Sequence, residues 1–357
     1  MFFMMALFCW NTNAQQWQHH TAEPSTYSII AWDSATGDIG IALQSTVLSA
    51  GALLPFAKAN LGGIIIQGIP DPGTGTRALE LLKSNTPRQT ADILLKTVQD
   101  SAQVQFAILD STGVCYPYSG KNCPLFTGYR YGNGYSVQGT FLRSDTVLQV
   151  MSAAFLKSRG DFSDRLLASL GAAEKAEGQH LQRRSAALLV IREGGGYGGS
   201  NDRYIDLRVD DDSLPLISLR RALERWQTSY SLEARLRTIE YFNNSRHFIQ
   251  ADNEKKRLIE SMNAQIRLKP DDANVLNNVA WTLAISNIDL ERALEFARRA
   301  VRLDPNNSDY LNTMAECFYR LGGYEDAIAI ASELVAKNPA DPYYYRQLLK
   351  FKEGRNK

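Results

Sequence analysis

The feature that most constrains the fold of this chain is an internal repeat in its C-terminal part. Pro270, Pro305 and Pro339 are 35 and 34 residues apart, and each follows the end of a segment with helical apolar spacing. Small residues, which let paired helices approach closely, occupy corresponding places in the two units: Ala280 and Ala315, Ala293 and Ala327, Ala297 and Ala331. Self-similarity at a period of roughly 20 to 50 residues is the signature of repeat architectures. We therefore predict an all-α stack of helix pairs in this part of the chain.

Residues 271–305 and 306–339 resemble tetratricopeptide repeats, with Trp281, Gly322 and Tyr324 at places typical of that pattern. The resemblance implies a surface for a protein or peptide partner. Two units are fewer than a stable stack usually needs, so we expect Ser231–Leu268 to pack against them as a degenerate unit.

Length and composition indicate one further domain before the repeats. A chain of 357 residues favours two domains, and 44% hydrophobic with 22% charged residues is ordinary globular composition. After Asp210–Asp212 glycine becomes scarce and the apolar spacing becomes helical. We predict a first domain at residues 25–221 and a helical domain at residues 222–357. A net charge of +1 provides no basic footprint, so we exclude nucleic acid as a partner.

Residues 1–24 are predicted to be a signal peptide and a short leader. Met1–Trp10 is apolar and about as long as a signal-peptide core, and small residues at Thr12 and Ala14 precede a suitable cleavage point. No Lys or Arg precedes Lys58, so either the leader is atypical or the true start lies upstream; a loose hydrophobic N-terminal segment is the alternative. No apolar run reaches the ~18 residues of a membrane helix. We expect an exported, periplasmic or extracellular protein with no membrane span.

The cysteine and histidine patterns argue against metal and cofactor chemistry. No CxxC pair occurs, so we expect no zinc site; Cys115 and Cys123 either bridge a short loop or are two separate buried thiols. His180 and His247 occur without HExxH spacing and without a GxSxG motif, which disfavours a Ser-His-Asp triad. We expect neither a cofactor nor a metal.

The first domain alternates strand groups with helix pairs. Strands are expected at 27–32, 39–45, 63–67, 104–109, 114–118, 135–142, 185–192 and 203–209, and helices at 77–83, 90–98, 145–157 and 162–177. Hairpin connections favour antiparallel sheets covered by helices. The fold class is therefore α+β, and two sheets in a four-layer sandwich accommodate this order.

Five segments of the first domain resemble a known family: 25–33, 40–45, 138–139, 185–190 and 194–211. That family is catalogued as domain of unknown function 1028, and the resemblance covers residues 25–221. It implies an Ntn-hydrolase-like αββα sandwich, in agreement with the predicted layers. It implies no particular substrate.

The resemblance places the chemistry at Thr26. In an Ntn hydrolase, a Ser, Thr or Cys that begins the first strand is the nucleophile, and its own α-amine, with a pKa of about 8, is the base. Family members resemble a chain that begins Met-Thr-Phe-Ser, and Thr26 matches that Thr. Because residues precede it, catalysis requires a cut between Ser25 and Thr26, by self-processing or by another protease. The alternative is an ordinary β-branched residue at the start of a strand.

Acyl transfer also needs oxyanion donors and a group that orients the nucleophile. The candidates are Ser45, Asn201 and Asp202 for catalysis and Arg77, Arg203 and Gln138 for substrate binding. Each also has a structural interpretation, such as a strand-end hydroxyl, a loop-capping ion pair or a solvated residue in the first turn of a helix. Thr140 stands where the family tends to have Asn after Gln138 and Gly139, so this member would be impaired if that side chain contributes to the oxyanion site.

Two functions fit these patterns. The first is an exported Ntn-type amidohydrolase that cleaves an amide or peptide bond through Thr26, while the repeats recruit a protein or peptide partner. The alternative is a non-catalytic Ntn-like module that binds a ligand or acts as a scaffold beside a peptide-binding repeat domain. The oligomeric state stays open, with a homodimer among the expectations.

Overall fold

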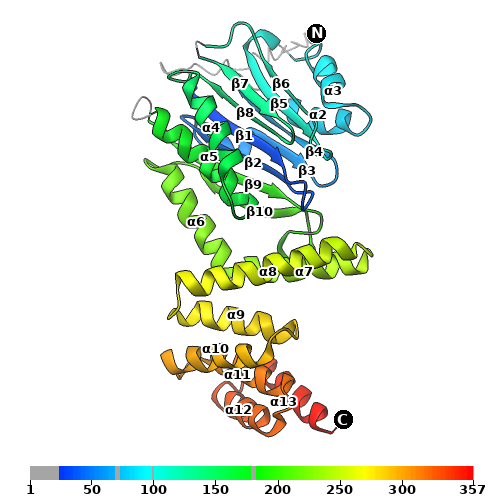
Figure 1. Ribbon diagram of the computed structural model, residues 1–357, viewed down its shortest axis with the longest axis vertical. Helices are drawn as coiled ribbons and strands as arrows, with labels where there is room; N and C mark the ends of the chain where they lie inside the picture. The colour runs from blue at the N-terminus through cyan, green and yellow to red at the C-terminus, as the bar shows by residue number, and fades with distance from the viewer. Residues whose placement is uncertain (1–23, 69–72, 99, 125, 178–181, 357) are drawn as a thin grey trace, which may run out of the picture.

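The computed structural model describes residues 24–68, 73–98, 100–124, 126–177 and 182–356. A sandwich of sheets and helices is followed by a stack of helices (Figure 1). The predicted signal peptide and leader lie outside the described residues, except for Pro24. Within the described ranges, no helix is long and apolar enough to cross a membrane.

The larger sheet has six antiparallel strands in the order β10-β9-β2-β1-β8-β7. The strands are β1 (Thr26–Trp32), β2 (Ile39–Ser45), β7 (Gly128–Gly132), β8 (Tyr135–Thr140), β9 (Ser185–Ile191) and β10 (Arg203–Val209). Thr26 pairs directly with Ser45 on β2 and with Thr140 on β8. The first residue of β1 therefore lies at the end of the sheet where both neighbouring strands also end.

The smaller sheet has four antiparallel strands in the order β3-β4-β5-β6. They are β3 (Pro55–Lys58), β4 (Gly62–Gly68), β5 (Val104–Asp110) and β6 (Cys115–Ser119). The short helix α1 (Ala50–Leu53) connects β2 to β3, and a 3-10 turn at Ser101–Gln103 precedes β5.

Two helix pairs cover the outer faces of the sheets (Figure 1). They are α2 (Thr74–Leu82) with α3 (Pro87–Leu94) on the smaller sheet, and α4 (Thr146–Lys157) with α5 (Phe162–Glu177) on the larger one. Side chains along β1 alternate between two cores: Ile29 packs with the helices, whereas Ile30 packs between the sheets with Ile65. The predicted four-layer αββα sandwich is confirmed.

The structure adds two strands that the sequence analysis did not predict, β3 and β7. Both are edge strands, so neither is buried between two neighbours. β3 has four residues and begins with Pro55, and β7 presents the exposed rings of Tyr129 and Tyr131. β3 (Pro-Phe-Ala-Lys) and β7 (Gly-Tyr-Arg-Tyr-Gly) lack the apolar runs that indicated most of the other strands, and an edge strand tolerates Pro and exposed side chains.

The helical part consists of antiparallel neighbours that stack in chain order (Figure 1). The helices are α6 (Pro215–Ser229), α7 (Ser231–Asn244), α8 (Phe248–Leu268), α9 (Ala273–Ile285), α10 (Leu290–Leu303), α11 (Ser308–Arg320), α12 (Tyr324–Lys337) and α13 (Pro342–Arg355). The first helix of each repeated unit has an N-cap side chain, from Asp272, Asn307 or Asp341. The expected degenerate unit, residues 231–268, forms α7 and α8 and shares a core with α9 and α10.

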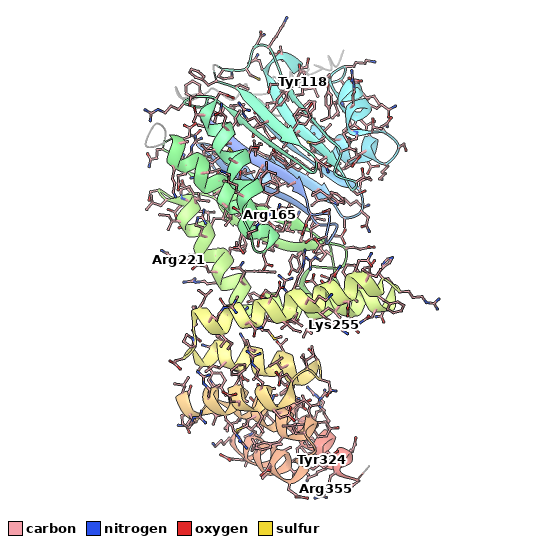
Figure 2. All side chains as sticks on the ribbon, viewed as in Figure 1. Tyr118, Arg165, Arg221, Lys255, Tyr324 and Arg355 are labelled. Carbon is pink, nitrogen blue, oxygen red and sulfur yellow. The ribbon has the colours of Figure 1, made fainter. Side chains whose placement is uncertain are left out.

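The junction between the two parts lies in α6. Leu216, Leu219 and Leu223 on this helix are buried against the larger sheet. The boundary predicted between residues 221 and 222 therefore falls inside a helix, because Leu223 continues the face that packs on the sandwich. Arg221 on α6 and Lys255 on α8 mark the two sides of the junction in Figure 2.

Candidate active site

Thr26 and Ser45 form a buried pair of hydroxyl groups at the end of the larger sheet. Thr26 is 2% exposed, and its Oγ1 lies 2.8 Å from Ser45 Oγ. The two residues are directly opposite in the β1–β2 register, so their side chains share the face between the sheets. The expectation that Ser45 lies beside Thr26 is confirmed.

The carbonyl oxygen of Ser25 lies among several donors next to this pair. It accepts hydrogen bonds from Arg183 Nη1 at 2.8 Å and from the Thr46 N–H at 3.0 Å. The hydroxyls of Ser45 and Thr46 approach it at 3.4 Å. Donors in this arrangement polarise the peptide bond between Ser25 and Thr26 and would stabilise negative charge on its oxygen.

Arg183 is a cation in a buried place. Its guanidinium lies 4.6 Å from the centre of the Tyr27 ring and 3.5 Å from Glu177 Oε2. Burial lowers the pKa of Arg183, and the negative charge of Glu177 opposes that shift. No motif in the sequence singles out Arg183, which lies two residues before β9. The pairing of Ser185 with Ser45 brings it to Thr26, and that pairing is not visible in the sequence.

A second set of polar side chains links the two sheets next to Thr26, around Ser28 on β1. Gln67 donates to the Thr26 carbonyl at 3.4 Å and to Gln105 Oε1 at 2.5 Å, and it accepts from Ser28 Oγ at 2.8 Å. Gln138 Nε2 donates to Ser28 Oγ at 2.7 Å. All five residues are buried, and buried polar groups are stable only when they are paired. The network therefore fixes β1 against β4 and β5.

Gln138 thus supports β1, with both ends of its amide already bonded within the buried network. This differs from its predicted role in substrate binding. Arg77, another predicted substrate ligand, is exposed on α2, which covers the outer face of the smaller sheet. The structure gives neither residue a contact with Thr26.

Asn201, Asp202 and Arg203 lie at the opposite end of the larger sheet from Thr26. Ser185, which begins β9, is paired with Ser45, whereas Arg203 is paired with Ile191 at the other end of β9. Six residues at about 3.3 Å each separate the two ends by about 20 Å. The structure therefore corrects the prediction that these residues share a site with Thr26.

The bonds of these hairpin residues explain their composition. The Asn201 side chain accepts from the Arg203 N–H at 2.8 Å, and the Asp202 side chain accepts from the Gly194 N–H at 3.2 Å. The side chain of Arg203 forms an ion pair with Asp206. These contacts shape the connection between β9 and β10, which includes a 3-10 turn at Tyr197–Gly199.

Cys115 and Cys123 are free thiols in the structure. Burial raises the pKa of Cys115 to about 12 and also raises that of Cys123, which leaves both thiols protonated at neutral pH. In the described part of the chain, no group of three or more His, Cys, Asp or Glu side chains could hold a metal ion.

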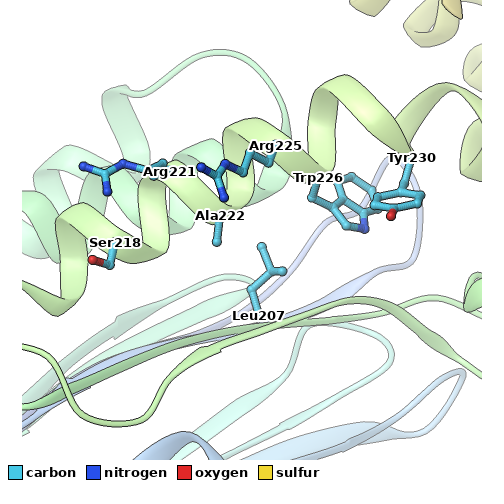
Figure 3. A pocket seen from close by; sticks show the side chains of 7 residues that line it. All are labelled: Leu207, Ser218, Arg221, Ala222, Arg225, Trp226 and Tyr230. Carbon is cyan, nitrogen blue, oxygen red and sulfur yellow. The ribbon is translucent and has the colours of Figure 1, made fainter.

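A surface hollow of about 420 Å³ lies between β10 and α6. Figure 3 shows the side chains of Leu207, Ala222 and Trp226 around it, with Arg221 and Arg225 on the same helix. Leu207 packs on the helix side of the larger sheet, whereas Thr26 faces the smaller sheet. The hollow is therefore separate from the Thr26 site.

Comparison with known proteins supports both parts of the fold. Residues 26–219 match a family model described as a family of unknown function, DUF1028, and residues 284–349 match a tetratricopeptide repeat model. The crystal structure of a Silicibacter pomeroyi protein assigned to the same DUF1028 model is 27% identical, with a TM-score of 0.53, and the alignment covers 58% of this chain and 92% of that one.

Two further structures match with low TM-scores. A tetratricopeptide repeat protein from Parabacteroides merdae is 12% identical over 59% of this chain and 73% of its own, with a TM-score of 0.29. The type IV pilus biogenesis factor PilW is 18% identical over 39% of this chain and 62% of its own, with a TM-score of 0.26. No curated protein matches the chain significantly.

Proposed function

This chain belongs to the family of unknown function DUF1028, and on that premise we propose that it is an exported Ntn-type amidohydrolase, activated by hydrolysis of the bond between Ser25 and Thr26. One observation carries the proposal. The Ser25 carbonyl oxygen accepts hydrogen bonds from Arg183 and the Thr46 N–H, directly beside the hydroxyl pair of Thr26 and Ser45. The nucleophile, a neighbouring hydroxyl and the oxyanion donors thus surround one peptide bond.

The geometry favours self-processing over cleavage by another protease, because the bond is buried. Thr26 Oγ1 attacks the Ser25 carbonyl carbon through a five-membered ring, and Arg183 and the Thr46 N–H hold the oxyanion. The bond from that carbon to the Thr26 nitrogen then breaks, and the hydroxyl proton, relayed by Ser45, ends on the nitrogen. Water hydrolyses the resulting ester to a Ser25 carboxylate and a free Thr26 amine.

The processed chain has a nucleophile and a base in one residue. The free α-amine, with a pKa of about 8, takes the proton of the Thr26 hydroxyl as Oγ1 attacks a substrate amide. The amine of the substrate leaves with a proton, and water hydrolyses the acyl-enzyme. The tetratricopeptide repeats supply the surface for a protein partner.

One observation favours the non-catalytic alternative. In the intact chain the Thr26 nitrogen is an amide without basicity, and the residue is buried. A chain that is never cleaved would therefore act as a binding or scaffold module beside the repeats.

The test is the intact mass and N-terminal sequence of the purified protein. We expect a chain that begins at Thr26, whereas Thr26→Ala keeps Ser25 attached and Thr26→Ser, which retains a hydroxyl, is processed. Amide hydrolysis by a chain that begins at Gln15 would refute the proposal. Cell fractionation tests the proposed export, and sedimentation tests whether the chain forms a homodimer.

A further inference from the structure

We infer that the space occupied by Ser25 in the intact chain is the acyl-binding subsite of the processed enzyme, and that it selects peptides cleaved after a serine. The inference rests on the proposed function. Self-processing and substrate hydrolysis both pass through an ester on Thr26 Oγ1, and both need the same donors for the carbonyl oxygen. The residue whose carbonyl is attacked therefore lies where Ser25 lies.

The side chain of Ser25 fills a small place lined by polar groups. Ser25 is 0% exposed. Its hydroxyl donates toward the carbonyl oxygens of Phe141 at 2.9 Å and Thr140 at 3.2 Å, and it accepts from Arg183 Nη1 at 2.9 Å. The Ser25 hydroxyl therefore provides a donor for the two carbonyl oxygens and an acceptor for the Arg183 guanidinium. An alanyl side chain would leave them without that partner, and a carboxylate would face two carbonyl oxygens.

Strained backbone holds part of this lining. Phe141 has a φ of 51°, in the left-handed region that bulky residues rarely adopt. The strained turn follows β8 directly, where the carbonyl groups of Thr140 and Phe141 both come within hydrogen-bond reach of the Ser25 hydroxyl. Strain of this kind is concentrated at functional sites and ligand clamps.

Contacts to the backbone extend the subsite by one residue. The Ser25 N–H donates to Thr46 Oγ1 at 3.0 Å, and the Pro24 carbonyl accepts from Thr140 Oγ1 at 3.3 Å. The contact from Thr140 requires an acyl group on the nitrogen of the serine. The subsite therefore fits an N-acylated seryl residue within a peptide better than a free serine amide, and Thr140 recognises the preceding carbonyl.

The first test uses the processed wild-type chain and three fluorogenic aminomethylcoumarin amides, of acetyl-Pro-Ser, acetyl-Pro-Ala and acetyl-Pro-Leu. We expect kcat/KM for the seryl probe to exceed that for the alanyl probe by about 10- to 100-fold, because the alanyl side chain forms no hydrogen bond with Arg183 or with the two carbonyl oxygens. The leucyl probe should not be cleaved detectably. Equal rates for the three probes would overturn the inference.

The two proposals fail in different ways. A chain that retains Ser25 and cleaves no probe contradicts the proposed function, and the inference falls with it. A chain that begins at Thr26 and hydrolyses other members of an amide library, but not the seryl probe, contradicts the inference alone.

The second test removes the contact to the preceding carbonyl. Thr140→Val should lower kcat/KM for the acetyl-Pro-Ser probe about tenfold more than for the seryl probe without its acetyl-Pro group. Thr90→Val is a matched control, because Thr90 Oγ1 is buried on α3 with no hydrogen-bond partner among the described residues. Equal losses on the two probes would contradict recognition of the preceding carbonyl.

Discussion

Arg183 carries a buried charge, and its Nη2 forms an ion pair with Glu177 Oε2 at 3.5 Å. Its side chain is 7% exposed, and Nη2 has no hydrogen-bond partner among the residues that the structure describes. Glu177 and the Tyr27 ring offset part of the desolvation, and Nη1 bonds both the carbonyl and the hydroxyl of Ser25. A guanidinium held in this way needs no rearrangement when charge develops on the Ser25 oxygen, which is the condition for electrostatic catalysis.

The first prediction follows from that geometry. Arg183→Lys keeps the positive charge, but a compact ammonium cannot reproduce the planar donor group, so processing at Thr26 should slow by about 10²- to 10³-fold. Mass spectrometry over time measures the fraction of chains that begin at Thr26. Arg184→Lys is the control, because Arg184 is exposed and pairs with Asp211. Normal processing of the Arg183 variant would exclude this residue as an oxyanion donor.

The contrast between Ser45 and Arg183 shows how far the site could be predicted from sequence. Ser45 belongs to the hairpin that follows Thr26, so local pairing places it correctly. Arg183 reaches Thr26 only because β9 lies beside β2, and strand order in a sheet is a property of the whole chain. The same reason explains the error at Asn201–Arg203: a polar hairpin indicates a turn but does not show at which end of the sheet it lies.

At the scale of elements, the glutamine network determines how the sheets meet. Gln67 bonds to Ser28 and Gln105 and so joins β4 to β1 and β5. We predict that Gln67→Leu lowers the free energy of unfolding by about 1–3 kcal/mol, because it leaves buried polar groups unpaired. Urea denaturation measures the change. Gln149→Leu, at an exposed position on α4, should change stability by less than about 0.5 kcal/mol. A Gln67 variant as stable as the wild type would show that these bonds add nothing to sheet pairing.

The helices of the repeats begin at recurring cap residues, each two positions after one of the three prolines that indicated the period in the sequence. The Asn307 side chain accepts from the backbone N–H groups of Asp309 and Tyr310 at the start of α11. We predict that Asn307→Ala lowers stability by about 1 kcal/mol in thermal or urea denaturation. Asn306→Ala is the matched control, because Asn306 is the exposed neighbour outside the cap. Equal effects of the two substitutions would exclude a specific capping role.

At the scale of the whole molecule, the repeats join the sandwich far from Thr26. Arg192 follows β9 at the end opposite Ser185, and it bonds Asp38 in the sandwich and Glu254 on α8. At about 3.3 Å per residue, the six residues from Ser185 to Ile191 put about 20 Å between these Arg192 contacts and the Thr26 end of the sheet. A partner on the repeats would therefore lie beyond the junction, on the side away from Thr26. Under the proposed function, its expected role is to place the protein at a location, and not to line the site at Thr26.

The ion pairs at the junction predict a dependence of stability on pH. Glu254 is buried and lies 2.6 Å from Arg235 and 3.3 Å from Arg192. Burial alone would raise the pKa of Glu254, but the positive charges of Arg192 and Arg235 hold it below its ordinary value of 4.5. Because the folded pKa is the lower one, the stabilisation is fully present above about pH 4.5 and is lost as the pH falls through the folded value.

Glu254→Gln should therefore destabilise the protein by about 3 kcal/mol at neutral pH, since it leaves two buried arginines without their shared carboxylate. The difference from the wild type should begin to shrink below about pH 4.5, where the carboxyl of the unfolded chain is protonated, and should be smallest below the folded pKa, where the wild-type carboxyl is neutral in both states. Urea denaturation between pH 3 and about 7 measures this difference. Glu260→Gln, at an exposed position on the same helix, is the control. A difference that stays constant with pH would show that Glu254 acts through packing rather than charge, and the junction would then owe its strength to apolar contacts.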